Sequence, residues 1–269
     1  MKSVVIIGAG NVAFHLCRAL IQNTVNVRQI FNRTLVNAEK IGEANNIPYT
    51  DKISELIKAD LYIIASSDSA IEELSHYIPY DDTLVVHTSG SMSTKVLKGN
   101  YRKGVLYPLQ TFSKIKSLKY DDIPFFVEAE DENDLEALVE LSKRVTNSVY
   151  KADSEKRLKL HMAAVWANNF SNHLYQIADG ICKEADIPFT VLQPLIKETY
   201  KKIKDLSPYD AQTGPARRGD EIVIEKHLDL LNHNSANQQL YKLLTESIKR
   251  TYSNDQLQTE TKEDKDADI

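Results

Sequence analysis

Cysteine is scarce in this chain, and long apolar runs are lacking. Among 269 residues there are two cysteines, Cys17 and Cys182, which lie too far apart for a metal-binding or disulfide motif. Both are expected in the core of a protein from a reducing compartment, and no metal is predicted. No run approaches the ~20 apolar residues of a membrane span, and Met1-Lys2 leads directly into a predicted strand without space for a signal peptide. We therefore expect a cytoplasmic protein that does not enter a membrane.

Clusters of positive charge are also lacking. Lys and Arg number 33 against 38 Asp and Glu, for a net charge of −5. Most of that charge lies in 253–269, predicted to be an acidic, disordered tail. No nucleic-acid partner is expected, because such a surface needs clustered Lys and Arg. A hydrophobic fraction of 42% is that of a globular protein, and the length suits two domains.

A glycine-rich turn stands near the start of the chain. The apolar run Val4-Val5-Ile6-Ile7 is typical of a strand buried on both faces, and Gly8-Ala9-Gly10-Asn11-Val12-Ala13 follows it. In the dinucleotide fingerprint Gly8 makes the tight turn, Gly10 lets a pyrophosphate approach the backbone, and Ala13 allows close packing of the next helix. The phosphates would bind at that helix's N-terminus. The alternative is a plain strand-to-helix turn without a ligand.

The residues after the second predicted strand, Val25–Phe31, bear on the choice of cofactor. In NAD enzymes an acid that binds the ribose lies roughly 20 residues beyond the glycines, whereas this chain has Asn32-Arg33-Thr34 there. A guanidinium that can bind a 2′-phosphate, with no carboxylate to repel it, favours NADP(H) over NAD. The alternatives are an exposed arginine in a turn, or an NAD-linked enzyme of the same fold.

Small polar residues follow two further predicted strands. Ser66 and Ser67 come after Leu61–Ala65 and leave space for the ribose and nicotinamide, while Asp68 is expected to cap the next helix. Ser89 follows Thr83–His87 and either binds a substrate or nicotinamide amide, or caps a helix near Thr94–Lys98. The remaining elements expected in this half are Leu35–Asn45, Ile47–Tyr49, Gly104–Tyr107, Ile123–Glu128, Glu132–Val145 and Ser148–Tyr150.

After residue 152 the pattern is helical. A long helix over about 155–185 carries a broad apolar stripe that includes Trp166 and Phe170. A polar stripe on it contains His161 and Asn168, which either face a cofactor cleft or form a solvated face. Further helices are expected near Phe189–Lys204, Glu221–Leu231 and Ala236–Tyr252, with a loop centred on 207–219, where Gly219 turns the chain and Asp220 caps the following helix.

The sequence thus predicts an α/β fold: a Rossmann-like, doubly wound, mainly parallel sheet followed by an all-helical C-terminal domain. The expected domains are an NADP-binding domain over 1–152, a helical substrate and dimerisation domain over 153–252, and the tail over 253–269.

The chain resembles two-domain proteins with a Rossmann-like N-terminal domain and a C-terminal helical domain of unknown function, regarded as NADP oxidoreductases. The blocks that carry the resemblance are Gly8–Ala13, Asn32–Thr34, His87–Gly90, Pro108–Phe112, His161 with Asn168-Asn169, and Thr213–Asp220 with His227. The chain is more distantly similar to pyrroline-5-carboxylate reductase, prephenate dehydrogenase, ketopantoate reductase and the β-hydroxyacid dehydrogenases. The resemblance implies a small-molecule substrate between the two domains and a homodimer formed through the helical domain.

The same resemblance implies roles for individual residues. It assigns NADP to Gly8, Gly10, Asn11, Val12, Ala13, Asn32, Arg33, Thr34, Ser66 and Ser67. It places Ser89, Gln110, Thr111, His161, Asn168, Thr213 and Arg218 near the substrate. Relatives have His where this chain has Tyr107, whose phenol, with an ordinary pKa near 10, is a poor proton carrier at neutral pH.

The hypothesis that follows is an NADP(H)-dependent oxidoreductase acting on a small carbonyl, imine or hydroxyl substrate that bears a carboxylate. His161 would carry the proton, with His227 in reserve, while Asn168 and Ser89 orient the reacting atom. Arg218 would pair with the substrate carboxylate, or else form a surface or interface salt bridge. The alternative, favoured by Tyr107, is a non-catalytic NADPH-binding sensor or scaffold.

Overall fold

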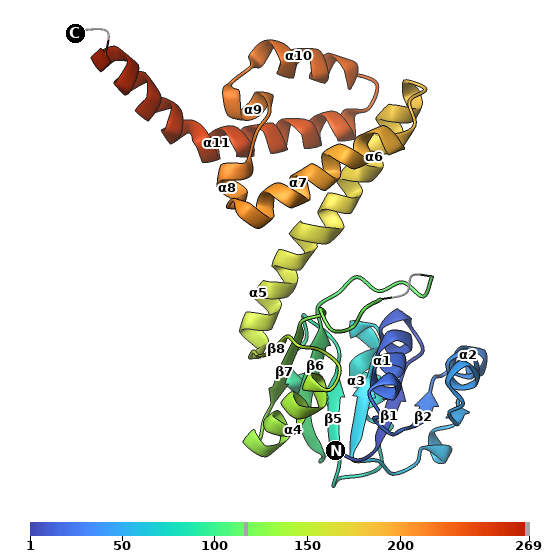
Figure 1. Cartoon of the computed structure of the whole chain (residues 1–269). Coiled ribbons are helices and arrows are strands. Elements are labelled where there is room, and N and C mark those ends of the chain that lie inside the picture. Colours follow the sequence, from blue (N-terminus) through green and yellow to red (C-terminus); the bar gives the residue numbers. More distant parts are fainter. Residues whose placement is uncertain (116–117, 267–269) are drawn as a thin grey trace. The chain divides into compact units, whose positions relative to one another are not determined.

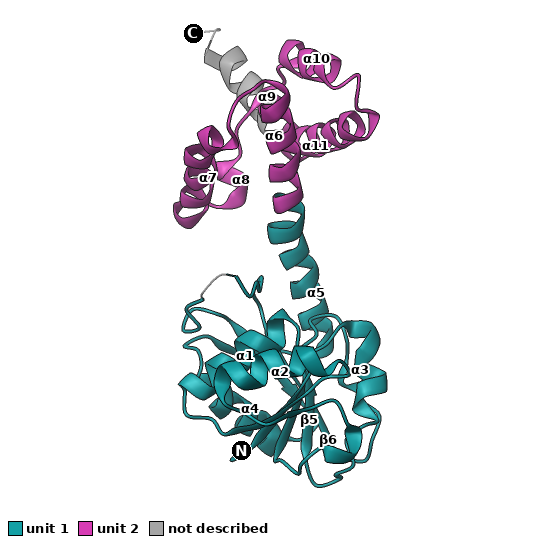
Figure 2. Cartoon of the chain, turned by 90° about the vertical axis from the view of Figure 1, so that its right-hand side faces the viewer, with its two compact units in different colours: residues 1–171 teal, residues 172–269 magenta. Residues whose placement is uncertain are grey.

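The computed structural model describes residues 1–115 and 118–266, with side chains as far as Ser253. It contains two compact units, Met1–Ser171 and Asn172–Ile269 (Figure 2). The division falls later than the boundary expected at 152–153, because the first helix after the sheet packs within the first unit. None of the helices in the described part is long and apolar enough to span a membrane.

One sheet of eight strands forms the centre of the first unit (Figure 1). Its order is β3-β2-β1-β4-β5-β6-β7-β8, and neighbouring strands are parallel except β6 and β7. The strands are β1 Val4–Ile7, β2 Val27–Phe31, β3 Tyr49–Thr50, β4 Leu61–Ile64, β5 Leu84–His87, β6 Arg102–Pro108, β7 Phe125–Ala129 and β8 Val149–Lys151. This confirms the predicted doubly wound sheet. The carboxyl ends of β1, β2, β4, β5 and β6 share one edge, where such folds bind ligands.

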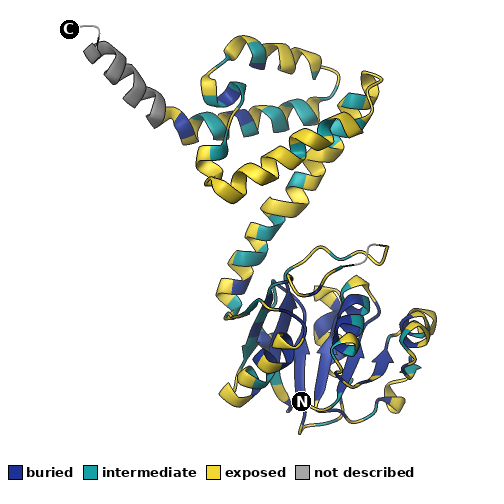
Figure 3. Ribbon diagram, in the orientation of Figure 1, coloured by how far each residue is buried: buried dark blue, intermediate teal, exposed yellow. Residues whose placement is uncertain are grey.

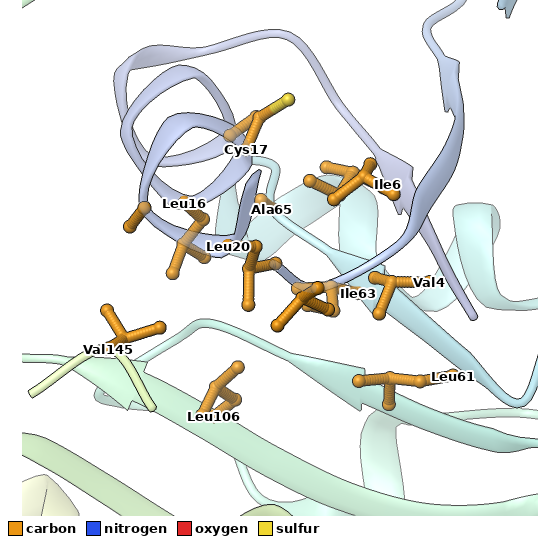
Figure 4. Packing of buried hydrophobic residues seen from close by; sticks show 14 of the residues in the cluster. Val4, Ile6, Leu16, Cys17, Leu20, Leu61, Ile63, Ala65, Leu106 and Val145 are labelled. Atoms are coloured by element: carbon orange, nitrogen blue, oxygen red, sulfur yellow. The ribbon is translucent and has the colours of Figure 1, made fainter. Parts of the chain in front are cut away.

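Both faces of the sheet are covered. Val4 and Ile6 pack with α1 (Asn11–Gln22), α2 (Leu35–Asn45) and α4 (Glu132–Lys143) in one apolar cluster. Figure 4 shows Leu16 and Leu20 of α1 in this cluster. Val5 and Ile7 point to the other face, where α3 (Asp68–Ser75) covers them. The central strands are therefore fully buried (Figure 3). Because these strands are packed on both faces, the residues that follow their carboxyl ends are held in defined positions.

The helix caps predicted in the first unit, at Asp68 and Ser89, are not found, whereas the cap predicted in the second unit, at Asp220, is present. Ser67, not Asp68, precedes α3, and no side chain caps this helix. Asp68 instead accepts a hydrogen bond from Ser91 Oγ at 2.5 Å. The N-cap residue of the short helix η2 (Thr94–Val96) is Ser93, so the capping role considered for Ser89 is wrong. In the second unit Asp220 accepts from the Val223 amide and caps α10, as predicted.

The predicted helix over about 155–185 is present and contains a π-helical segment. It comprises α5 (Ser154–Ala164), η3 (Val165–Phe170) and α6 (Ser171–Glu184). The helices that follow are η4 Phe189–Leu192, α7 Gln193–Asp205, α8 Pro208–Ala211, α9 Pro215–Arg218, α10 Glu221–Leu230 and α11 Ser235–Asp266. The expected loop over 207–219 thus holds two short helices. The backbone is helical as far as Asp266, inside the predicted disordered tail, and residues 267–269 lie outside the described residues.

The second unit buries little apolar surface. Among its described residues the buried apolar ones are Ala216, Ile224 and Tyr252. The Tyr252 ring packs against the Tyr209 ring, with centroids 4.5 Å apart, and the Tyr252 hydroxyl donates a hydrogen bond to the Tyr209 carbonyl at 2.8 Å. Large apolar residues of α6, α7, α10 and α11 are exposed, and Figure 3 shows exposed residues along the described parts of these helices.

Candidate functional site

The turn between β1 and α1 has the shape of a phosphate cradle. Gly8 has a φ of +118°, and a Cβ there would lie 2.2 Å from the Ala65 carbonyl oxygen, so a side chain cannot be accommodated. A Cβ on Gly10 would meet nothing within 4 Å, which leaves the backbone open to a ligand. No side chain caps α1, and its first turn contains no acidic residue. Its first N–H groups are therefore suited to a pyrophosphate.

Arg33 lies at the carboxyl end of β2 and is paired with an acid that the sequence pattern did not predict. Its Nη1 is 2.9 Å from Oε2 of Glu73, on α3. Glu73 also accepts a hydrogen bond from Tyr77 Oη at 2.6 Å, and this bond, followed by the charge of Arg33, lowers the pKa of Glu73. Because 40 positions separate Arg33 from Glu73, local motif reading could not have found the pair. Both side chains are about half exposed, so the guanidinium is accessible.

Tyr107 and His161 form a hydrogen-bonded pair near the ends of β5 and β6. Tyr107 Oη lies 3.2 Å from His161 Nδ1. Burial raises the pKa of Tyr107, so its hydroxyl is protonated at neutral pH. A Cβ on Gly90 would lie 2.7 Å from the Tyr107 ring and 2.8 Å from His161 Nδ1. Glycine at position 90 therefore makes room for the pair.

The loop after β5 is held by a buried histidine. The Ser89 amide donates to His87 Nδ1 at 3.2 Å, and His87 Nε2 lies 3.3 Å from the Ser93 carbonyl oxygen. Since a carbonyl can only accept, Nε2 carries the proton. Burial, with a smaller contribution from Arg157, lowers the pKa of His87 to about 4. His87 is therefore neutral and structural at physiological pH.

Ser89 Oγ is engaged by its own loop. It accepts from the amides of Ser91 and Met92, each at 3.1 Å, and lies 3.3 Å from Ser91 Oγ. Ser91 Oγ in turn donates to Asp68. These contacts keep the loop folded beside Tyr107 and His161. Together they give Asp68 a role that the sequence did not reveal.

Arg157 is a buried cation one helical turn before His161. Its side chain is 1% exposed and bonds to the Glu128 carboxylate of β7 and to the Met92 carbonyl. Its Nε has no hydrogen-bond partner among the described residues. Arg157 thus ties α5 to the sheet and to the loop after β5. The polar sequence around it gave no sign of this burial.

The other predicted site residues are divided between the two units. Asn168 is exposed on η3 and Thr111 in the loop after β6, where Gln110 Oε1 accepts from the Thr111 amide at 2.8 Å. Thr213 and Arg218 are exposed in the second unit. His227, also in the second unit, has its Nδ1 2.8 Å from Tyr241 Oη. The first unit therefore brings Ser89, Tyr107 and His161 together, at the sheet edge that also carries Gly8–Ala13.

The residues predicted to bind the cofactor lie at the glycine turn and after strands β2 and β4. Ala13 is fully buried against the sheet, and Asn11 donates from Nδ2 to the Phe112 carbonyl at 3.0 Å. Asn32 Nδ2 donates to the Thr34 carbonyl at 3.0 Å, which shapes the turn before α2. Ser66 is half-buried beside Ala65, and Ser67 Oγ lies 3.3 Å from Ser69 Oγ.

Comparison with known proteins gives the same architecture. Residues 123–248 match a domain of unknown function (DUF2520). The structure of a putative NADP oxidoreductase from Bacteroides fragilis is 41% identical in sequence, covers 93% of this chain and 98% of its own, and has a TM-score of 0.88. The chain matches none of the curated proteins with which it was compared.

Two more distant structures show the same fold. A 1-pyrroline-5-carboxylate reductase from Streptococcus pyogenes is 16% identical, with 92% of this chain and 98% of its own covered and a TM-score of 0.58. An imine reductase from Myxococcus stipitatus in complex with NADP+ is 12% identical, with coverage of 93% and 94% and a TM-score of 0.62. The predicted distant similarity to reductases of this architecture is confirmed.

Proposed function

This chain belongs to one family with the Bacteroides fragilis protein and matches the domain of unknown function DUF2520, and on that premise we propose that it is an NADP(H)-dependent oxidoreductase. It would transfer hydride between the nicotinamide and a small carbonyl, imine or hydroxyl substrate. The observation that carries the proposal is the Tyr107–His161 pair, a proton-handling group in the same unit as an open glycine turn.

The cofactor residues proposed are those that surround the turn and the end of β2. The N–H groups of Asn11, Val12 and Ala13 would receive the pyrophosphate, with Gly8 and Gly10 providing the space. Arg33, flanked by Asn32 and Thr34, would bind the 2′-phosphate. Ser66 and Ser67 would lie along the ribose and nicotinamide. The NADP+ complex of the imine reductase of the same fold supports this choice of cofactor.

His161 is proposed to give or take the proton. The nicotinamide supplies the hydride when bound. The Tyr107 hydroxyl can donate to a bare Nδ1, or accept from Nδ1–H when the imidazole is charged, so Nδ1 is occupied in both states. Nε2 is then the nitrogen available to the substrate. Tyr107 thereby positions His161 rather than replacing it as a proton carrier.

The remaining groups would orient the substrate. Asn168 and Ser89 are proposed to hold the reacting oxygen or nitrogen, Gln110, Thr111 and Thr213 to contact the substrate, and Arg218 to pair with its carboxylate. Arg218 is a suitable candidate because its side chain is exposed. Its neighbour Arg217, by contrast, is bonded to the Asp210 carbonyl at 3.3 Å and lies over the Tyr252 ring.

The test is anaerobic NADPH oxidation across a panel of keto acids and imines. We expect His161→Ala to abolish turnover while the NADPH dissociation constant, from fluorescence titration, stays within about twofold. Tyr107→Phe should lower kcat by about tenfold and alter its pH profile, because the His161 imidazole loses its hydrogen-bond partner at Nδ1. His76→Ala, a change of an exposed histidine in the first unit, is the matched control, and His227→Ala tests the reserve candidate. Full turnover by His161→Ala would remove His161 from the mechanism.

The rival proposal is a non-catalytic NADPH sensor or scaffold. It shares the cofactor site but needs no proton carrier, so NADPH binding without turnover of any substrate in the panel would favour it. Tighter binding of NAD than of NADP would instead contradict the role of Arg33.

Dimerisation is part of the proposed function. A unit in which Ala216, Ile224 and Tyr252 are the buried apolar residues described has too little core to be stable alone. A second copy of the chain would cover the exposed apolar side chains of its helices. As part of the same proposal, the protein would act in a reducing compartment such as the cytoplasm, where thiols like those of Cys17 and Cys182 stay reduced.

A further inference from the structure

The segment after β6 is fastened to the first turns of α1 by consecutive residues. The Phe112 carbonyl accepts from Asn11 Nδ2, and the Ser113 carbonyl lies 3.0 Å from His15 Nε2. Next in sequence, Lys114 places its Nζ 3.0 Å from the carbonyl oxygen of Ala9, the middle residue of the glycine turn. A side chain more than 100 positions away is thus brought to the proposed phosphate cradle.

His15 holds the segment 112–114 in place by hydrogen bonds. It is 1% exposed, and its Nδ1 lies 3.0 Å from Tyr120 Oη. Because the Ser113 carbonyl can only accept, Nε2 of His15 carries a proton, and the Tyr120 hydroxyl can donate to Nδ1. The Phe112 ring lies over His15 with centroids 5.3 Å apart. The buried His15 ring therefore holds the segment 112–114 both by its hydrogen bond to the Ser113 carbonyl and by its contact with the Phe112 ring.

Lys114 supplies what the glycine turn lacks. The turn offers N–H groups and the partial positive charge of a helix end, but a pyrophosphate carries full negative charge. The Lys114 ammonium has three donors, and its bond to the Ala9 carbonyl uses one of them. It also lies 6.0 Å from the Phe14 ring centroid, which keeps it over the first turn of α1.

We propose that Lys114 is a pyrophosphate-binding residue of the dinucleotide site, placed at the glycine turn by the His15-anchored segment 112–114. The assignment rests on the proposed use of NADP(H), and it is separate from the role of Arg33. Lys114 acts on the pyrophosphate, which NADPH and NADH share, whereas Arg33 acts on the 2′-phosphate, which NADH lacks.

The test is calorimetric titration of the full chain with NADPH, NADH and adenosine 2′-monophosphate, which has the 2′-phosphate but no pyrophosphate. Lys114→Gln should weaken NADPH and NADH by the same factor, about tenfold, and leave adenosine 2′-monophosphate unchanged. Arg33→Gln should weaken NADPH and adenosine 2′-monophosphate but spare NADH. Lys119→Gln, a change of an exposed lysine in the same connection, is the matched control.

The possible failures are distinguishable. Wild-type affinity of Lys114→Gln for both dinucleotides, or tighter binding, would overturn the assignment, and so would an equal loss of adenosine 2′-monophosphate binding. If the unaltered protein bound no NADPH, the proposed function itself would fall, and this assignment with it. His15→Phe, which keeps a buried ring but loses both hydrogen bonds, should reproduce part of the Lys114→Gln loss, and it should do so for the same ligands.

Discussion

His87 is a buried imidazole that holds the loop beside the proposed site. Its neutral ring accepts from the Ser89 amide, and its Nε2–H points to the Ser93 carbonyl. Burial lowers its pKa to about 4 from an ordinary value of 6.5. Between these values the unfolded chain binds a proton that the folded protein does not. The stability due to neutral His87 is therefore complete above pH 6.5 and is lost as the pH falls toward 4.

We predict that acidification destabilises the protein partly through His87. The linkage amounts to about 3 kcal/mol in the free energy of unfolding when the shift is fully expressed. His87→Gln has no such proton to bind, so its unfolding free energy should fall less steeply between pH 7 and pH 4. Urea denaturation of both proteins at several pH values measures the difference. Parallel curves for the two proteins would contradict the prediction.

At the residue scale, the sequence could predict what depends on local geometry. The fingerprint predicts the roles of Gly8 and Gly10. In the structure a Cβ on Gly8 would clash with the Ala65 carbonyl, whereas the space beside Gly10 is open. Lys114 and Glu73 could not be found in this way, because each reaches its partner across the fold. Tyr107 lacks the imidazole expected of the family, yet its hydroxyl lies at hydrogen-bond distance from His161.

At the scale of elements, α5 shows why an amphipathic pattern can mislead. Hydrophobicity favours burial of Leu158 and exposure of Arg157, but Leu158 is 49% exposed and Arg157 1%. Arg157 can be buried because the Glu128 carboxylate and the Met92 carbonyl compensate its charge. The buried strands, whose apolar runs need no such compensation, were predicted nearly to their ends.

We predict that Arg157→Met lowers the free energy of unfolding by about 3 kcal/mol, because it leaves the Glu128 carboxylate without its buried partner. The double variant Arg157→Met with Glu128→Met should lose less, since no charge is then left unpaired. Lys151→Met is the control: Lys151 is half exposed, and removing its ion pairs with Glu132 and Glu136 should cost less than about 1 kcal/mol. Urea denaturation followed by circular dichroism measures all three. An additive double variant would show that Arg157 and Glu128 do not interact.

At the scale of the whole molecule, the two units differ in how their apolar residues are used. The first unit buries its central strands β1, β4 and β5 completely, whereas in the second unit Leu230 is 72% exposed, Ile222 69% and Leu195 64%. Exposed apolar surface of this extent is typical of a surface that binds another protein. A helical periodicity indicates that a face is apolar, but it does not say whether the same chain or another copy covers it.

We predict a dimer in which helices of the second unit cover one another between two copies. Light scattering should give twice the 30.5 kDa chain mass at micromolar concentration, and the midpoint of urea unfolding should rise with protein concentration. Leu195→Glu and Leu230→Glu place a charge on exposed apolar positions and should shift the equilibrium toward monomer, because a buried unpaired carboxylate is costly. Lys197→Glu, on the same helix as Leu195, keeps a polar side chain and should leave the dimer intact. A monomer with a concentration-independent midpoint would contradict the interface, since the exposed side chains would then need no partner.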